Sequence, residues 1–275
     1  MKLQYLGTAA AEGVPAFFCE CEVCRKARER GGRNIRTRSQ AIVNDKLLLD
    51  FPCDTLGHIQ TNGIDLLNVR HCLITHGHDD HFYPVDMLYL RDGYAHLPEG
   101  WGGFNVYGSP EIAEEMEKAE AEIGGTLKYH CVEPFVTFDA GGLAVTPLKA
   151  SHGTPHPYIY IISDGERTML YAHDTGDFPG ETWEYLSRCS VKFDFVSLDC
   201  TEGANESIGY NAHMCLGDNR RCREKLKMLG LCREGTLFAA NHFSHNGLNA
   251  GYDEFSYIAA KEDFLTTYDG MTIQF

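Results

Sequence analysis

The stretch that decides the fold is Thr75-His76-Gly77-His78-Asp79-Asp80-His81, which directly follows the apolar run Cys72-Leu73-Ile74. An apolar run of this kind predicts a buried strand, and two histidines at i and i+2 leaving its end point the same way. Asp80 and His81 follow where the next helix is expected to begin. Imidazole and carboxylate are ligands that suit Zn²⁺, Mn²⁺ or Fe. The stretch therefore predicts a metal site at the end of a strand.

Three further ligand-type residues follow apolar runs farther along the chain. They are His152, Asp174 and His242, and each comes just after a run that is expected to be a strand. Each one alone is more often a polar strand-end residue than a ligand. All three in succession, downstream of H-x-H-x-D-H, favour a shared metal site at the edge of a sheet.

Short apolar runs rich in β-branched residues recur along the chain, with helical patterns between some of them. The expected strands are Lys2–Leu6, Ala41–Asn44, Lys46–Asp50, His71–Thr75, Leu143–Leu148, Tyr158–Ser163, Thr168–Ala172, Phe193–Leu198 and Thr236–Ala240. The expected helices lie around Pro84–Arg91, Pro110–Ile123, Glu181–Leu186 and Met214–Leu229. Strands clustered in two stretches predict an α+β fold with two packed sheets flanked by helices. No repeat or linker interrupts the pattern, so we expect one domain over residues 1–275.

Composition and charge limit the functions that the chain can serve. Of 275 residues, 43% are hydrophobic and 23% charged, which allows a sizeable core. The formal charge of −15 argues against a long nucleic acid as partner, because its binding depends on Lys and Arg. No apolar run reaches the roughly 18 residues of a membrane span, and the first residues do not resemble a signal peptide. We expect a cytoplasmic protein with no membrane partner.

The 11 cysteines include one cluster, formed by Cys19, Cys21 and Cys24. In a reducing compartment, clustered cysteines are more often metal ligands than disulfides. Three thiolates this close bind one Zn²⁺ tetrahedrally if a fourth ligand arrives from elsewhere in the chain. The alternative, three free thiols, stays open at this point.

The order H-x-H-x-D-H, then His, Asp and His, resembles the metallo-β-lactamase superfamily, whose fold is a four-layer αββα sandwich. The resemblance implies a centre of two divalent metals, Mn²⁺, Zn²⁺ or Fe. It assigns His76, His78 and His152 to one metal, Asp80, His81 and His242 to the other, and Asp174 to a bridging position. It also implies that Asp50 supports the site behind the ligands, with Asp54 as the alternative for that role.

The N-terminal region is similar to that of the PhnP-type cyclic phosphodiesterases, which act on 5-phosphoribosyl 1,2-cyclic phosphate. The shared features are the opening Gly7-Thr8-Ala9-Ala10-Ala11-Glu12-Gly13-Val14-Pro15 and the C-x-C-x-x-C of Cys19, Cys21 and Cys24. The resemblance implies a structural Zn²⁺ on these three cysteines, in a hairpin near residues 15–30, with His245 as the fourth ligand. It further implies that His213 is a general acid.

The function implied is hydrolysis of a small anionic phosphodiester, such as a cyclic sugar phosphate or nucleotide. A metal-bound hydroxide would attack phosphorus, Asp80 would help to orient it, and His213 would protonate the leaving alkoxide. No long nucleic acid is expected as a partner, and a homodimer is left open.

Other functions remain in competition. A glyoxalase-like thioesterase would share the metal ligands, but a thiolate leaves without a general acid and would give His213 no task. A PqqB-type protein would share the cysteine cluster. A tRNA nuclease is disfavoured by the charge of −15. A β-lactamase is disfavoured because Asp174 stands where the common zinc lactamases have Cys, and a structural metal-binding module would need neither the full ligand set nor His213.

Three features depart from the PhnP type or have no assigned role. The segment 92–103 reads as a loop that could cover the site, or be a plain surface connection. His156 and His173 are additional histidines beside His152 and Asp174, and could line a pocket of different shape. The identity of the substrate is therefore not predicted.

Overall fold

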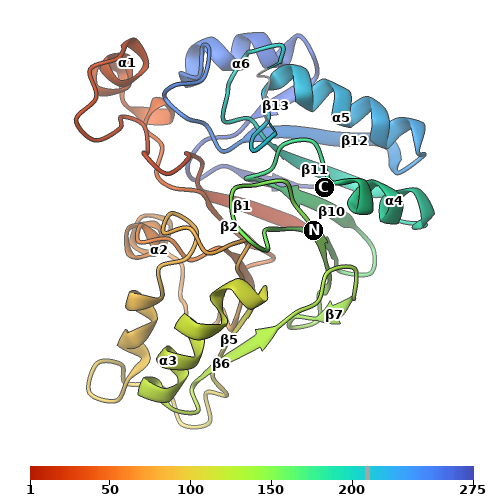
Figure 1. The fold of residues 1–275 in the computed structure, drawn as a ribbon. Coiled ribbons are helices and arrows are strands. Elements are labelled where there is room, and N and C mark those ends of the chain that lie inside the picture. Colours follow the sequence, from red (N-terminus) through yellow and green to blue (C-terminus); the bar gives the residue numbers. More distant parts are fainter. Residues whose placement is uncertain (208–210) are drawn as a thin grey trace.

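The computed structural model describes residues 1–207 and 211–275, which form two seven-stranded sheets packed face to face (Figure 1). The first sheet holds, in spatial order, β14 (Thr272–Gln274), β1 (Lys2–Gly7), β2 (Gln40–Val43), β3 (Leu47–Leu49), β4 (His71–Leu73), β5 (Phe104–Gly108) and β6 (Leu127–Cys131). The second holds β13 (Phe264–Thr266), β12 (Cys232–Asn241), β11 (Phe193–Asp199), β10 (Thr168–Ala172), β9 (Tyr158–Ser163), β8 (Ala144–Lys149) and β7 (Phe138–Asp139).

Helices lie on the outer faces of both sheets (Figure 1). The α-helices are α1 (Glu22–Arg30), α2 (Thr55–Asn62), α3 (Ala113–Ile123), α4 (Gly180–Arg188), α5 (Leu216–Met228) and α6 (Tyr252–Ala260). Three 3₁₀ segments, η1 (Gly32–Asn34), η2 (Pro84–Leu90) and η3 (Pro110–Ile112), connect or extend them. In Figure 1, α2 and α3 flank the first sheet, while α4, α5 and α6 lie over the second.

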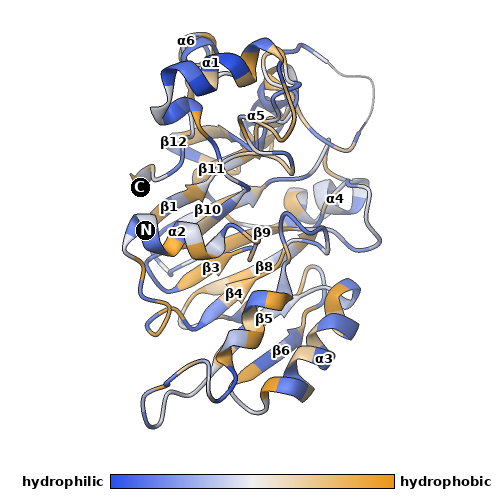
Figure 2. Ribbon diagram, turned by 90° about the vertical axis from the view of Figure 1, so that its left-hand side faces the viewer, coloured by the Kyte–Doolittle hydropathy of each residue, from blue (hydrophilic) through white to orange (hydrophobic). Residues whose placement is uncertain are grey.

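The strands are apolar on both faces, because one face of each sheet packs against the other sheet and the opposite face packs against helices. In β3, Leu47 and Leu49 belong to the core between the sheets, and Leu48 belongs to the core under η2 and α3. In β9, Ile162 faces the space between the sheets, whereas Ile161 packs into the core under α4 and α5. Successive side chains of a strand point to opposite faces, so a strand buried on both sides reads as a continuous apolar run. In Figure 2 the ribbon beside the labels of β3 and β8 is mostly orange, the colour of hydrophobic residues.

The predicted four-layer αββα sandwich is confirmed. One apolar core lies between the sheets, and one lies between each sheet and its helices. Each expected strand overlaps an observed one, and the pattern over residues 214–229 is the helix α5. The helix predicted around Pro84–Arg91 is wrong in type, because these residues form the 3₁₀ segment η2, which begins at Pro84.

Parallel strand pairs bring the predicted ligands to one edge. Strand β3 runs parallel to β4, and β10, β11 and β12 run parallel to one another. The loops after β10 and β12 therefore leave the second sheet in a common direction and carry Asp174 and His242, while the loop after β4 of the first sheet carries the histidine motif. Within the described part of the chain, the longest helix falls short of a membrane span and none is sufficiently apolar.

Ile162 offers a test of the core between the sheets, since its side chain is 0% exposed there. We expect Ile162→Ala to lower the free energy of unfolding by about 2–5 kcal/mol, and Ile162→Val by about 0.5–1.5 kcal/mol, because each change removes buried methyl groups and leaves a cavity. Denaturant unfolding of the metal-saturated protein measures both values. Ile35→Ala, at a side chain 37% exposed, is the control; equal losses at positions 35 and 162 would contradict the assignment.

Candidate metal centre

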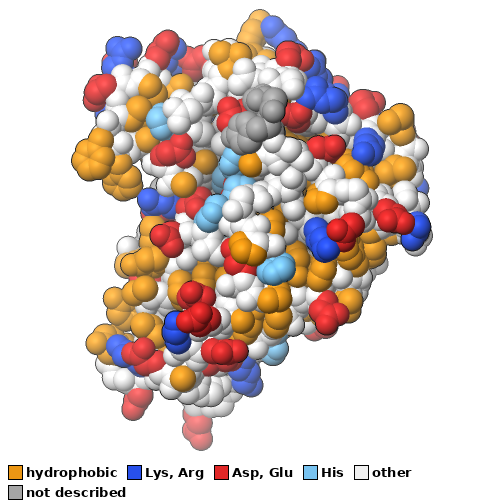
Figure 3. Space-filling model, in the orientation of Figure 1, with side chains coloured by type: hydrophobic (Ala, Val, Ile, Leu, Met, Phe, Trp, Pro, Cys, Tyr) orange, Lys and Arg blue, Asp and Glu red, His pale blue; other side chains and the backbone are white. Residues whose placement is uncertain are grey.

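The predicted ligands gather in a recess midway along one face of the molecule, where Figure 3 shows histidine side chains beside acidic ones. They come from loops that follow four different strands, β4, β8, β10 and β12. Two neighbouring groups of side chains result. The first group is His76, His78 and His152, and the second is Asp80, His81, Asp174 and His242.

In the first group, three imidazole nitrogens point at one another. Nδ1 of His78 lies 3.1 Å from Nε2 of His76 and 3.1 Å from Nε2 of His152. Nδ1 of His152 is 3.1 Å from the carbonyl oxygen of Ala212, which it can reach only as a donor. Nε2 of His152 is then the lone-pair nitrogen of the neutral ring and faces the other two.

In the second group, Asp174 lies between two further imidazoles. Nε2 of His81 and Nε2 of His242 are 3.2 Å apart. Oδ2 of Asp174 contacts Nε2 of His81 and is 3.0 Å from Nε2 of His242. Its Oδ1 is 3.8 Å from Nε2 of His152, so this one carboxylate borders both groups.

These residues fit divalent metal ions. Zn–N bonds of normal length give tetrahedral N···N edges of about 3.3 Å, close to the 3.1 to 3.2 Å seen here. Oδ2 of Asp174 is buried yet has no hydrogen bond of acceptable geometry, although two imidazole nitrogens are near it. A buried anionic oxygen without a donor is costly, and a coordinated cation removes that cost.

The electrostatics of the second group favour a bound cation. Burial alone opposes charge on His81, but the carboxylates of Asp174, Asp80 and Asp50 raise the pKa of this imidazole well above its usual range. The same balance of burial against the Asp174 and Asp199 carboxylates raises the pKa of His242 to about 10. The negative carboxylates that favour a proton on these imidazoles also favour a metal ion. A bound metal ion would replace the proton on the ligand nitrogen.

Asp50, rather than Asp54, contacts the site. Oδ2 of Asp50 accepts a hydrogen bond from Nδ1 of His81 at 2.7 Å, and Oδ1 accepts from the Thr75 backbone N–H at 2.8 Å. Nδ1 of His81 therefore carries the proton, and Nε2 is left to face Asp174. Asp54 instead accepts from the backbone N–H of Arg38 and pairs with the guanidinium of that residue.

Asp199 is a buried site residue that the sequence analysis did not single out. Its Oδ2 accepts from the Asp174 backbone N–H at 3.0 Å and faces Nδ1 of both His213, at 3.2 Å, and His242, at 3.4 Å. It is the last residue of β11; His242 directly follows β12, and Asp174 stands two residues after β10. The strand-end criterion that singled out His242 and Asp174 applies to Asp199 as well.

Three of these strand-end residues adopt left-handed backbone conformations. The φ angle is 68° at Asp50, 50° at Asp174 and 64° at His242. Asp and His are among the few non-glycine residues enriched in this region, and such conformations cost on the order of 1–3 kcal/mol each. The surrounding hydrogen bonds hold them in place, and the chain turns sharply so that these side chains point into the site.

His213 lies next to both groups. Its Nδ1 is 3.2 Å from Oδ2 of Asp199 and 3.3 Å from Oδ1 of Asp174, and its ring centroid is 5.0 Å from that of His152. Burial opposes the charged form, but the Asp199 carboxylate raises the pKa of His213 above its usual value. With Asp174, Asp199 and His242, this imidazole also forms a group that could hold a metal, so the geometry allows either an acid or a ligand.

The three predicted cysteines and His245 come together in a separate group. Nδ1 of His245 is 3.4 Å from Sγ of Cys19 and 3.4 Å from Sγ of Cys21. Zn–S and Zn–N bonds of normal length give a tetrahedral edge of about 3.6 Å. Partial burial opposes ionisation of Cys21, but the Cys24 backbone N–H and His245 outweigh it and lower the pKa of the Cys21 thiol to about 6. The group is therefore suited to a zinc ion.

The recess is a cleft of about 350 Å³. Its lining residues are Ala10, Ala11, Glu12, His78, Asp80, His152, Asp174, Thr201, Glu202, His213, His242, Ser244 and Asn246. The two additional histidines do not line it. His173 is 1% exposed and its Nε2 is 2.7 Å from Oγ of Ser197, while His156 lines a different cavity together with Pro155 and Pro157.

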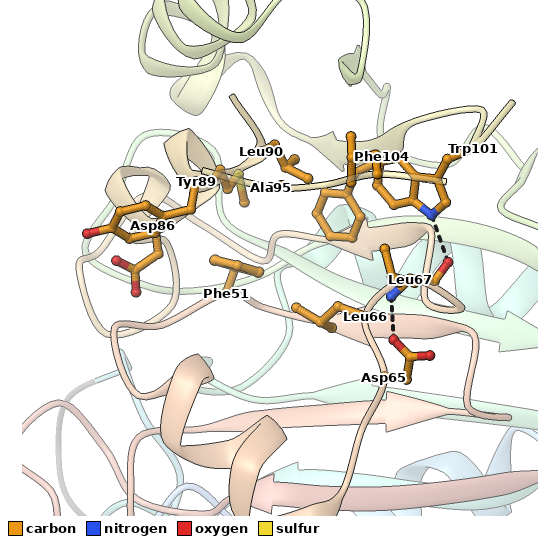
Figure 4. Close-up of a pocket in the computed structure, with 12 residues that line it drawn as sticks. Phe51, Asp65, Leu66, Leu67, Asp86, Tyr89, Leu90, Ala95, Trp101 and Phe104 are labelled. Carbon is orange, nitrogen blue, oxygen red and sulfur yellow. Dashed lines mark hydrogen bonds between the residues drawn. The ribbon is translucent and has the colours of Figure 1, made fainter. Parts of the chain in front are cut away.

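A second cavity, of about 250 Å³, is apolar and shares no lining residue with the cleft (Figure 4). Figure 4 shows Phe51, Leu90, Phe104 and Leu66 around its interior, with Trp101 donating a hydrogen bond to the Leu67 carbonyl at its rim. Residues of the segment 92–103 line this cavity, and none of them lines the cleft. The loop is thus placed against an apolar pocket and does not cover the predicted ligands.

The family model described as beta-lactamase superfamily domain matches residues 54–249. A curated relative, an octanoyltransferase of Porphyromonas gingivalis, is 28% identical over 204 residues, which are 70% of this chain and 38% of that protein. The chain spans 38% of the length of the curated relatives it matches, so their whole activities are not carried over.

Two solved structures share the fold over the whole chain. A diphosphatase from the PhnP family is 19% identical with a TM-score of 0.74, covering 100% of this chain and 96% of that one. Zn²⁺-bound PqqB from Methylobacterium extorquens is also 19% identical with a TM-score of 0.74, covering 100% of both chains. At this identity the likeness is one of fold.

Removing the carboxylate behind His81 tests the second group of ligands. We expect Asp50→Asn to weaken divalent metal binding by about 10- to 100-fold, because the amide no longer fixes the His81 ring or raises its basicity. Metal analysis after titration with a chelator measures the change. Asp54→Asn is the matched control, and an equal loss in that variant would contradict the role given to Asp50.

Changing one cysteine tests the separate group. We expect Cys21→Ser to remove one zinc ion per chain, because a hydroxyl is a far poorer zinc ligand than a thiolate, while metal at the histidine groups stays bound. Elemental analysis of the purified protein counts the ions. Cys131→Ser, at an exposed cysteine outside the group, should leave the count unchanged; loss of all metals in Cys21→Ser alone would show that the two sites are not separable.

Proposed function

Since the chain belongs to the β-lactamase superfamily, matched over residues 54–249, we propose that it hydrolyses a small phosphodiester. Family and ligand clusters together make it a metal-dependent hydrolase of the metallo-β-lactamase fold. What is proposed is the bond that it cleaves, the two divalent ions (Mn²⁺, Zn²⁺ or Fe) at the histidine groups, and the third, structural Zn²⁺ on the cysteines.

The observation that carries the proposal is the pair of His213 and Asp199 at the cleft. A carboxylate 3.2 Å from Nδ1 stabilises the protonated imidazole and fixes the orientation of the ring. An alcohol leaving group needs a proton as its bond to phosphorus breaks, whereas a thiolate leaves without one. A protonated imidazole beside the metal ligands therefore supports cleavage of a P–O bond to an alkoxide.

The ligand groups, the two aspartates and His213 would have separate roles in the reaction. Divalent ions held by the two groups would supply an acidified water and positive charge to offset that on the phosphoryl oxygens. Asp80 and Asp174 would orient the attacking water, since both line the cleft beside the ligand histidines. His213 would donate its proton to the departing oxygen and recover it from solvent.

The cleft volume of about 350 Å³ supports a substrate of sugar or nucleotide size. Thioester hydrolysis is the second candidate, favoured by the likeness to a protein named octanoyltransferase. The two candidates differ in what they require of His213, because only an alkoxide leaving group depends on its proton.

Replacing His213 tests the proposal. We expect His213→Ala to slow hydrolysis of an alkyl phosphodiester by about 10²–10⁴-fold, and that of bis(p-nitrophenyl) phosphate much less, because nitrophenolate leaves unprotonated. Steady-state rates on the two substrates, with metal content measured in parallel, give the comparison.

The matched control is His96→Ala, since His96 is exposed in the loop over the second cavity. Equal losses on both substrates, together with a loss of metal, would make His213 a ligand instead of an acid. Hydrolysis of thioesters without hydrolysis of either diester would establish the second candidate.

A further inference from the structure

The cleft carries no lysine or arginine side chain among the described residues that line it; its basic groups are the ligand histidines and His213. Two carboxylates, Glu12 and Glu202, line it besides the predicted ligands Asp80 and Asp174. The bound metals would attract the phosphodiester that reacts. Apart from the ligand groups and His213, the charged side chains among the described lining residues are these two glutamates, so no lysine or arginine there pairs with another phosphate group of the substrate.

Two basic residues adjoin lining residues of the cleft, in contact or in sequence, and both are paired. Arg38 donates to the carbonyl oxygen of Ala11 at 2.8 Å, and its guanidinium is 3.3 Å from the Asp54 carboxylate. Lys149, three residues before His152 in the chain, pairs with Glu181 at 2.5 Å. Each of these cations has a carboxylate partner, and neither lines the cleft.

Glu12 is the carboxylate best placed to accept a hydrogen bond from the substrate. Its Oε1 accepts from the Ser244 hydroxyl at 2.6 Å and from the Asn246 amide at 3.4 Å, and lies 3.5 Å from Nε2 of His245. Its side chain remains 33% exposed. No hydrogen bond within residues 1–207 and 211–275 uses its Oε2. One oxygen is thus fixed by the protein while the other can accept from a ligand.

We propose that Glu12 selects substrates whose non-reacting part bears hydroxyl or ammonium donors and no second phosphate. This rests on the proposed phosphodiesterase function and narrows its substrate class. A hydroxyl or ammonium group gains a charge-assisted hydrogen bond from the fixed carboxylate. A phosphate in the same place meets the like charge of this carboxylate.

A pair of probes that differ in one phosphate tests this. The metal-loaded protein is assayed with adenosine 2′,3′-cyclic phosphate and with the same compound phosphorylated at its 5′-hydroxyl. We expect kcat/KM to be roughly tenfold or more higher for the first probe at low ionic strength, with the ratio shrinking as salt screens the repulsion. Glu12→Gln should shrink the ratio at low salt as well.

Glu184→Gln is the matched control, because it makes the same change in net charge on the exposed surface of α4. It should leave the ratio unchanged. An equal or higher kcat/KM for the 5′-phosphorylated probe, or the same fall in the ratio for both variants, overturns the role of Glu12 while diester hydrolysis stands. Metal content of each variant is measured, since Glu12 also contacts His245.

A binding measurement distinguishes failure of this inference from failure of the proposed function. Calorimetry compares adenosine 3′-phosphate with adenosine 3′,5′-bisphosphate on the metal-loaded protein, without any turnover. Tighter binding of the monophosphate, weakened by Glu12→Gln, supports the inference even if no diester is hydrolysed, an outcome that would refute only the proposed function. Tighter binding of the bisphosphate, or binding of neither, overturns the inference.

Discussion

The structure depends on one constraint, which is that lone pairs of five imidazoles and two carboxylates converge in a small space. Nitrogen atoms of neighbouring rings lie 3.1 to 3.2 Å apart, and an acid oxygen between them has no donor. Such an arrangement is repulsive unless positive charge lies among them. The cation that meets this need ties together loops after four strands of two different sheets, so site and sandwich support each other.

The loop after β12 extends this connection to the cysteine group. Phe243 donates its backbone N–H to the Thr8 carbonyl at 2.9 Å and accepts from the Ala10 N–H at 3.0 Å. The buried guanidinium of Arg36 lies 4.1 Å above its ring. His242 faces the histidine groups on one side of Phe243, and His245 faces the cysteines on the other. One short loop therefore positions a predicted ligand of each group, His242 and His245.

The sequence predicted the sandwich and the residues that gather in the recess, because both follow from where apolar runs end. It could not predict α2 or α6, since the first is largely polar and the second follows a loop without a helix-start signal. Asp199 was overlooked although it ends a strand, because it adjoins no histidine in sequence. Glu12 could not be found at all, since its place in the cleft depends on contacts with residues more than 230 positions away. The single-domain organisation and the individual metal assignments stay predictions.

The left-handed turns at Asp50, Asp174 and His242 have a consequence for how such a site can change over evolutionary time. The backbone at these three positions admits Gly, Asn, Asp and His more readily than other residues. Three of those four types are themselves metal ligands or hydrogen-bonding partners of ligands. Most substitutions that the backbone tolerates at these three positions therefore introduce residues that can still bind a metal or support a ligand. A lineage with this scaffold can exchange one metal preference for another, or lose a ligand and regain it, without first remodelling its main chain.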